Sequence, residues 1–313
     1  MELDRQARAF LLMSRPHTRI YELDAVAARE AVSSSPDQLG GGPAVAEVCE
    51  LKVPVGGGSE IPARRYSPAD PHGTIVWLHG GGWVFDGLEE ADAMCRTLAN
   101  ASGASVIDVD YRVAPEHPFP VPLDDCYDAL VWLAEHEAAG PLVLGGDSAG
   151  GNMAAVCALR ARDTPSRGTA RGGPTLLAQV LIYPITDCDL ATPAYLEHGE
   201  DERLLLGSAE MAWFFDQYVP DPAARSDPEV SPLRAAEHSG LPPAIVLVAE
   251  YDPLRDDGLR YAQALRDAGV QVTLLRHDDQ PHGFFSQVQT IDASRDAVTR
   301  IATLLRAMID AAG

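Results

Sequence analysis

The chain has 313 residues, of which 46% are hydrophobic and 22% are charged, so it is long enough for one large domain or one domain with an insertion. Its formal net charge of −22 argues against a nucleic acid or an anionic membrane as a partner, because either would require clustered Lys and Arg. Lysine occurs once, at Lys52, which excludes a P-loop and a Ser-x-x-Lys site and disfavours Schiff-base chemistry.

The first 45 residues predict two helices that we expect to contribute to a cap. One carries an apolar stripe and ends at Pro16, and the second lies near Ala25–Val32. The Ser33–Pro43 stretch is rich in Ser, Pro and Gly and predicts a loop. Two β-like runs, Val45–Val55 and Ile61–Tyr66, follow it on either side of a glycine-rich turn.

From Thr74 onward, short apolar strands alternate with amphipathic helices. Because the strands are near-continuous runs of Val, Ile and Leu, they predict an α/β fold, with a mostly parallel central sheet and helices on both faces. Ligands of such sheets bind beyond the carboxyl ends of the strands. The predicted strands are Ile75–Leu78, Ser105–Asp110, Leu142–Gly145, Leu177–Tyr183, Ala244–Ala249 and Val270–Leu275. The predicted helices lie near Ala91–Ser102, Leu123–His136, Asn152–Arg162, Leu259–Ala268 and Asp292–Ala311.

The alternation fails between Asp187 and Pro232, where two aromatic-bearing stretches read as helical. They are Leu204–Leu206 and Ala209–Tyr218. We expect residues 187–225 to form a cap insertion over the carboxyl ends of the strands, because loops at this edge of the sheet commonly carry binding function. A helical excursion that packs elsewhere is the alternative. Residues 46–186 and 226–313 would then form the catalytic domain.

Residues 146–150 read Gly-Asp-Ser-Ala-Gly and stand between a predicted strand and a predicted helix. This order is that of a nucleophile elbow, in which a serine at the tip of a tight turn has a strained backbone. Gly146 and Gly150 are needed because a side chain beside this turn would collide with the neighbouring strand and helix. Ser148 is therefore the candidate nucleophile, although the pentapeptide alone leaves a plain Gly/Ser turn open.

A serine hydroxyl needs a base, and the base needs a carboxylate that orients it. His282 is the candidate base, because the Pro before it and the Gly after it indicate an exposed loop between the last strand and the last helix. His277 is the rival, but it ends a predicted strand beside two aspartates. Asp252 directly follows a strand and is the candidate orienter, ahead of Asp256 and Asp257, which suit a helix start.

The developing oxyanion needs hydrogen-bond donors, and His79-Gly80-Gly81-Gly82 follows a predicted strand. Amides without side chains approach a substrate oxygen closely, and together with the amide of Ala149 they would converge on one oxyanion. Each such donor contributes about 3–4 kcal/mol in the transition state. A glycine-rich hairpin is the alternative for this tetrapeptide when it stands alone.

The remaining polar clusters do not suggest a metal ion or an organic cofactor, and we expect neither. The aspartates at positions 108, 110, 124, 125 and 128 have no His or Cys at ligand spacing, and they suit helix starts and strand ends. The five cysteines form no C-x-x-C pair and indicate reduced core thiols. With no signal peptide pattern and no run of ~18 apolar residues, a cytoplasmic protein is expected.

Five motifs together resemble the hormone-sensitive lipase family of esterases, which are α/β-hydrolases with an HGGG motif and a helical cap. The likeness runs from about Ile61 to the C-terminus, and Gly-Asp-Ser-Ala-Gly resembles the branch with Asp before the nucleophile. It implies that Ser148, Asp252 and His282 are catalytic and that Gly81, Gly82 and Ala149 supply the oxyanion donors. The motifs are His79–Trp83, Tyr111–Pro120, Gly146–Gly151, Asp252–Asp256 and His282–Phe284.

The resemblance implies a serine carboxylesterase that hydrolyses small-molecule esters with short-to-medium acyl chains through an acyl-enzyme. Five aromatic residues would line an apolar pocket under the cap: Trp83, Phe85, Trp213, Phe214 and Phe215. An amide, N-acetyl or secondary-metabolite deacylase would use the same triad, and a non-catalytic ligand-binding protein would use the same scaffold. The family often pairs subunits through its last strand, so Val270–Leu275 would serve a homodimer.

Overall fold

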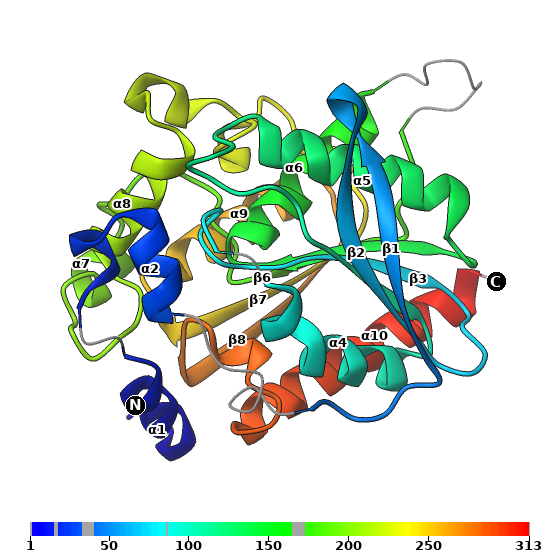
Figure 1. The fold of residues 1–313 in the computed structure, drawn as a ribbon, viewed down its shortest axis with the longest axis horizontal. Helices are drawn as coiled ribbons and strands as arrows, with labels where there is room; N and C mark the ends of the chain where they lie inside the picture. Colours follow the sequence, from blue (N-terminus) through cyan, green and yellow to red (C-terminus); the bar gives the residue numbers. More distant parts are fainter. Residues whose placement is uncertain (1, 16–17, 33–40, 86, 165–172, 313) are drawn as a thin grey trace.

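The computed structural model describes residues 2–15, 18–32, 41–85, 87–164 and 173–312. Its centre is an eight-stranded sheet in the order β1-β2-β4-β3-β5-β6-β7-β8 (Figure 1). The strands β3 to β8 run parallel, whereas β1 and β2 form an antiparallel pair beside β4. The strands are β1 (Glu47–Val55), β2 (Ser59–Ser67), β3 (Thr74–Leu78), β4 (Ser105–Val109), β5 (Leu142–Asp147), β6 (Ala178–Ile182), β7 (Ala244–Tyr251) and β8 (Val272–Pro281).

Helices cover both faces of this sheet (Figure 1). On one face lie α4 (Leu88–Ser102) and α10 (Asp292–Ala312), and on the other lie α5 (Val121–His136), α6 (Ala149–Asp163) and α9 (Arg255–Asp267). Alternate strand residues point to opposite faces, so Ile75 and Trp77 pack with α4 and α10, while Val76 and Leu78 pack with α5 and α6. Because both faces are covered, the central strands are apolar throughout.

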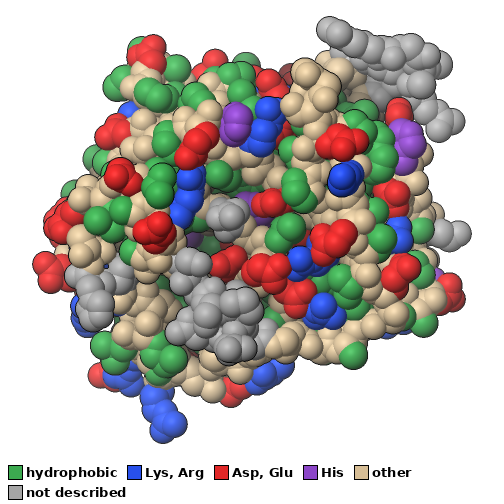
Figure 2. Space-filling model, in the orientation of Figure 1, with side chains coloured by type: hydrophobic (Ala, Val, Ile, Leu, Met, Phe, Trp, Pro, Cys, Tyr) green, Lys and Arg blue, Asp and Glu red, His purple; other side chains and the backbone are tan. Residues whose placement is uncertain are grey.

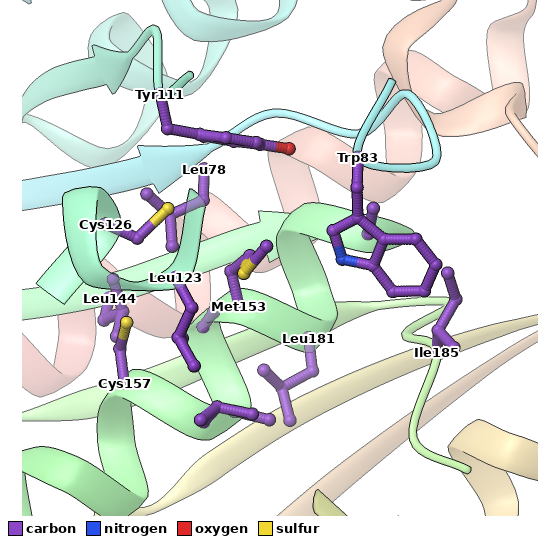
Figure 3. Close-up of a cluster of buried hydrophobic side chains, with 14 of the residues drawn as sticks. Leu78, Trp83, Tyr111, Leu123, Cys126, Leu144, Met153, Cys157, Leu181 and Ile185 are labelled. Atoms are coloured by element: carbon purple, nitrogen blue, oxygen red, sulfur yellow. The ribbon is translucent and has the colours of Figure 1, made fainter. Parts of the chain in front are cut away.

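The core on the α5 and α6 side packs strand leucines against small and sulfur-containing side chains of the helices (Figure 3). Leu78 and Leu144 meet Cys126 of α5 and Met153 and Cys157 of α6. Burial raises the pKa of the Cys126 and Cys157 thiols above the usual range, so both are protonated and poorly nucleophilic. All five cysteines are free thiols.

The N-terminal segment and the segment between β6 and β7 lie together at one end of the molecule, where α2, α7 and α8 group in Figure 1. The indole Nε1 of Trp213 donates to the Leu23 carbonyl, and Arg19 pairs with Glu210 at 3.4 Å. These contacts join the N-terminal helices to α8. The elements are α1 (Arg5–Ser14), η1 (Ile20–Glu22), α2 (Ala25–Val32), α7 (Pro193–His198), α8 (Ser208–Tyr218), η3 (Pro222–Ser226) and η4 (Pro232–Arg234). Two further 3-10 turns are η2 (Gly56–Gly58) and η5 (Phe284–Ser286).

The predicted strands and helices are confirmed, with three corrections. Leu204–Leu206 is not helical, and the short helix α7 was not predicted. The last strand does not end near His277 but continues to Pro281, because β7 extends alongside it to Tyr251. Part of the predicted Ser33–Pro43 loop, residues 33–40, lies outside the described residues.

Acidic and basic side chains are intermixed on the surface. Figure 2 shows Lys and Arg side chains scattered among Asp and Glu, with no gathering of positive charge on the face in view. In the described ranges, no helix has both the length and the apolar character needed to cross a membrane.

Candidate active site

Ser148 stands at the turn between β5 and α6 in a strained conformation, with φ 54° and ψ −116°. The turn is so tight that a Cβ at Gly146 would lie 2.4 Å from the carbonyl oxygen of Gly150. A Cβ at Gly150 would lie 1.8 Å from the carbonyl oxygen of Leu78 on the neighbouring strand. Only glycine fits at either position, as the motif predicted. The turn leaves the Ser148 residue 8% exposed.

The imidazole of His282 lies between a hydroxyl and a carboxylate that are distant in sequence. Its Nε2 is 3.0 Å from Ser148 Oγ, and its Nδ1 is 2.8 Å from Asp252 Oδ2. The Asp252 carboxylate is fully buried, and its other oxygen accepts a hydrogen bond from Leu254 N at 2.8 Å. Because a buried carboxylate needs donors, Nδ1 carries the proton, and Nε2 is left to accept one from Ser148.

The rival residues have other partners. Asp257 accepts hydrogen bonds from Thr186 N at 2.8 Å and Asp187 N at 3.0 Å, and burial raises its pKa to about 7. Asp256 caps α7 through Ala194 N. His277 lies within β8 with its ring 4.9 Å from that of Phe284, and burial lowers its pKa.

The glycine-rich turn after β3 has a left-handed backbone at two of its glycines. The φ angles are 114° at Gly81 and 59° at Gly82, and the Gly81 carbonyl accepts from Val84 N and Phe85 N. Ala149 is the first residue of α6, where a backbone N–H has no acceptor within the helix. Helix N-termini of this kind favour negative charge.

Three side chains hold the glycine-rich turn in place, and the sequence analysis did not predict any of these three roles. Asp147 Oδ1 accepts from Gly80 N and from Trp77 Nε1, both at 3.2 Å. His79 Nδ1 donates to the Gly80 carbonyl at 2.8 Å, and the Tyr111 hydroxyl donates to the His79 carbonyl at 2.8 Å. In the sequence, only the occurrence of these three residues within the family motifs could have indicated such a role.

The carboxyl of Asp147 lies next to Ser148 in the sequence and accepts hydrogen bonds from two N–H groups. Burial raises the pKa of Asp147, whereas the imidazoles of His79 and His282 act in the opposite direction. The ionised form of Asp147 is therefore stabilised by its two N–H donors and by the neighbouring imidazoles.

The five predicted pocket residues separate into two groups. Trp83 is 0% exposed and Phe215 is 1% exposed, and both rings pack together, with Trp83 also stacked on Tyr218 at 4.6 Å. In this conformation they are packing residues rather than pocket surface. Phe85 contacts the rings of Trp213 and Phe214, with centroids 6.4 and 5.6 Å away.

Phe214 lies directly over the glycine-rich turn. A Cβ on Gly82 would come 2.3 Å from the Phe214 ring, so the aromatic ring and the glycine backbone are in close contact. This contact brings α8 down onto the segment that follows β3.

One group of potential metal ligands occurs in the described part of the chain: Glu197, His198 and Glu250 offer ligand atoms within 4.8 Å of one another. The guanidinium of Arg255 donates to both carboxylates. Positive charge is thus already supplied there by the protein.

Comparisons with known proteins identify the family of this chain. Residues 75–286 match the family described by the alpha/beta hydrolase fold. The chain is 39% identical over 293 residues to the carboxylic ester hydrolase LipN of Mycobacterium tuberculosis, covering 91% of this chain and 76% of LipN. It is 35% identical to an ethyl acetate hydrolase of Pseudomonas putida over 269 residues, covering 83% of this chain and 82% of the relative.

The solved structure of a hyperthermophilic esterase from the archaeon Pyrobaculum calidifontis has the same fold. It gives a TM-score of 0.89 at 37% identity, and the match covers 98% of this chain and 99% of that chain. The chain therefore belongs to the hormone-sensitive lipase type of the alpha/beta hydrolase family, and it is a carboxylic ester hydrolase.

Proposed function

We propose that Ser148, His282 and Asp252 form the catalytic triad of this ester hydrolase. His282 Nε2 takes the Ser148 proton while Oγ attacks the ester carbonyl, and the tetrahedral intermediate collapses as the alcohol leaves with that proton. Water activated by His282 then attacks the acyl-serine and releases the acid. The observation that carries this proposal is the relay of hydrogen bonds, 3.0 Å from Ser148 Oγ to His282 and 2.8 Å from His282 to Asp252.

The amides of Gly81, Gly82 and Ala149 are the proposed donors to the tetrahedral oxyanion. Positive φ at both glycines and the position of Ala149 at the start of α6 support this role. A preorganised donor in such a site contributes about 3–4 kcal/mol to the transition state. The hydrogen bonds from Gly80 N to Asp147 and from Tyr111 to the His79 carbonyl hold this turn in place.

The proposed substrates are esters with short-to-medium acyl chains. The close approach of Phe214 to Gly82 supports a small acyl site, since a long chain would require the ring to move. The name of the Pseudomonas putida relative, ethyl acetate hydrolase, supports a small ester. Matched esters and amides of one acyl group, compared by kcat/KM, would separate esterase from amide or N-acetyl hydrolase activity.

The test of the proposed triad is Ser148→Ala. We expect the rate of ester hydrolysis to fall about 10⁴- to 10⁶-fold, because the remaining groups give only residual catalysis. A fluorophosphonate should label the wild type at Ser148 and leave the variant unlabelled, while circular dichroism and Tm stay unchanged. Ser226→Ala, at an exposed serine of η3, is the control and should keep full activity. Wild-type hydrolysis by Ser148→Ala would refute the proposal.

Three further predictions concern assembly, location and domain boundaries. A homodimer through β8 is proposed because this strand forms one edge of the sheet, and an edge strand carries N–H and C=O groups that can pair with a second copy. Light scattering would give twice the mass of one chain. A cytoplasmic location, based on the scattered cysteines, stays a prediction, as do the boundaries of the cap at residues 187–225.

A further inference from the structure

Tyr183 packs its ring against the imidazole of His282. The ring centroids are 4.4 Å apart and the planes are tilted by 51°. Tyr183 is 1% exposed, so it is a fixed part of the interior and not a surface that substrate reaches. The two nitrogens of the imidazole are held by hydrogen bonds to Ser148 and Asp252. These bonds leave the tilt of the ring plane, about the line through the two nitrogens, to be restrained by packing.

The backbone at Tyr183 is strained. Its φ of 34° lies in the left-handed region, which a bulky aromatic residue rarely adopts. The residue follows β6, and its amide donates to the Leu247 carbonyl of β7 at 2.7 Å. Strain of this kind persists only where the surrounding structure holds it, and such positions cluster at active sites.

The segment that carries Tyr183 is also bound to the nucleophile. Ser148 N donates to the Ile182 carbonyl at 2.9 Å, and Ile185 N donates to the Ser148 carbonyl at 3.4 Å. The residues on both sides of Tyr183 thus contact the Ser148 backbone, while the Tyr183 side chain contacts His282. One short segment therefore connects the positions of the nucleophile and the base.

The contact depends on the aromatic ring and not on the hydroxyl. The buried Tyr183 hydroxyl makes no hydrogen bond with His282, Ser148 or Asp252, and the polar group beside it is the backbone of Phe285. Burial raises the pKa of this phenol well above its ordinary value, and the carboxylates of Asp147 and Asp252 add to the effect, so Tyr183 is neutral. A neutral aromatic face also attracts the imidazolium that forms when His282 takes a proton.

We propose that Tyr183 is a positioning residue whose ring fixes the plane of His282 relative to Ser148. The inference rests on the proposed triad. Removing the ring lets the imidazole plane tilt about the line through its two nitrogens, so that the Nε2 lone pair meets the Ser148 hydroxyl at a poorer angle, which slows attack without changing how the substrate binds. A misplacement of about 1 Å at a reacting group costs on the order of 10²-fold in rate.

The experiment compares Tyr183→Phe, Tyr183→Met and Tyr183→Leu with the wild type on one small ester. Tyr183→Phe should keep kcat within about twofold, because the ring remains. The Met and Leu variants should lose about 10- to 100-fold in kcat, and in the single-turnover rate of acylation, with KM within about twofold. Wild-type kcat in the Met or Leu variant overturns the inference. So does an equal loss in Tyr183→Phe, which would assign the effect to the hydroxyl.

Nuclear magnetic resonance gives a second measurement on folded protein. In the wild type and Tyr183→Phe, the ring protons of His282 should be shifted upfield by the neighbouring aromatic ring. The low-field Nδ1 proton signal should be sharp in both and broadened in the Met variant. If the aliphatic variants do not fold, an unshifted His282 signal in the wild type still overturns the inference. Ser148→Ala, measured in parallel, separates the proposed role of Tyr183 from the proposed triad. Ester hydrolysis at the wild-type rate in that variant would contradict the triad itself.

Discussion

Asp252 has no exposed surface and joins the imidazole of His282 to the backbone of the next helix through Leu254 N. Its proposed task is to hold the imidazole in the tautomer whose Nε2 accepts a proton. An amide in its place presents an N–H to the imidazole and stabilises the other tautomer.

We therefore expect Asp252→Asn to lower kcat about 10⁴-fold while the fold survives. Steady-state kinetics with a chromogenic ester measure this effect. Asp256→Asn is the matched control, because that carboxylate caps α7 through Ala194 N and is expected to change kcat by less than about threefold. A large loss in the control with little loss in Asp252→Asn would reverse the assignment of the orienter.

Single residues differ in how far the sequence predicts their roles. The sequence predicts catalytic roles for Ser148, His282 and Asp252 because each follows a strand end or lies in a recognisable turn, which is a local property of the sequence. The anchoring role of Asp147 depends on Trp77 Nε1 and Gly80 N, which lie on another strand and its following turn, so no local pattern reveals it. The burial of Trp83 likewise depends on α8, far along the chain.

Elements were predictable where hydrophobic periodicity was strong. The strands of the central sheet are continuous apolar runs, and β3 and β5 were placed within two residues. The sequence predicts that the last strand ends near His277, yet β8 continues to Pro281 because β7 provides pairing up to Tyr251. Pairing of this kind is a tertiary effect, so it overrides the local pattern.

Helix α8 sets the size of the substrate site in our proposal, since Phe214 contacts Gly82. Phe214→Ala removes the ring and should raise kcat/KM for esters with longer or branched acyl groups relative to acetate esters, by about tenfold. A series of acyl lengths on one alcohol measures the change. Phe215→Leu is the comparison, because that ring is in the core, and it should alter stability more than acyl preference. An unchanged acyl profile in Phe214→Ala would contradict the proposed site.

The N-terminus of α9 carries a buried carboxyl whose titration makes stability depend on pH. Burial raises the pKa of Asp257 from 3.8 to about 7. Between these values the folded state holds a proton that the unfolded state has released, so this group makes the protein less stable as pH rises from about 4 to 7. The slope is about 1.4 kcal/mol per pH unit within that window.

Asp257→Asn should therefore weaken the fall in unfolding free energy between pH 5 and pH 8, measured by urea denaturation. The two backbone donors, Thr186 N and Asp187 N, keep an acceptor in the amide oxygen. Asp267→Asn, at the other end of α9 where the carboxylate is exposed, is the control and should leave the wild-type slope. A slope that is the same in all three proteins would exclude Asp257 as its source.

At the scale of the molecule, the N-terminal segment packs against loops that follow two strands of the sheet, although it precedes them in the sequence. Arg29 of α2 donates to the Val84 carbonyl at 2.8 Å and to the Ala114 carbonyl at 2.7 Å. It thereby connects the turn after β3 with the loop that follows β4. The sequence predicts that these helices contribute to the cap. It does not predict the Arg29 contacts, because the acceptors are backbone carbonyls, which every residue carries.

The excess of acidic residues also acts on the whole molecule. There are 46 Asp and Glu against 24 Lys and Arg, and several arginines already bridge two acids, as Arg160 does with Asp124 and Glu229. The remaining acids repel one another in the compact state. Salt shortens the range of this repulsion to about 10 Å at 0.1 M, while close ion pairs are screened less. The net effect of salt should therefore be stabilising.

We expect Tm to rise by a few degrees between 10 mM and 0.5 M NaCl, at about 1.5 °C for each kcal/mol gained in a chain of 313 residues. Scanning calorimetry at pH 8 measures it, and an uncharged osmolyte at equal osmolality separates screening from general exclusion effects. Neutralising exposed acids, as in Glu60→Gln with Asp310→Asn, should raise Tm at low salt and reduce its salt dependence. A Tm that falls with added salt would mean that the ion pairs outweigh the repulsion.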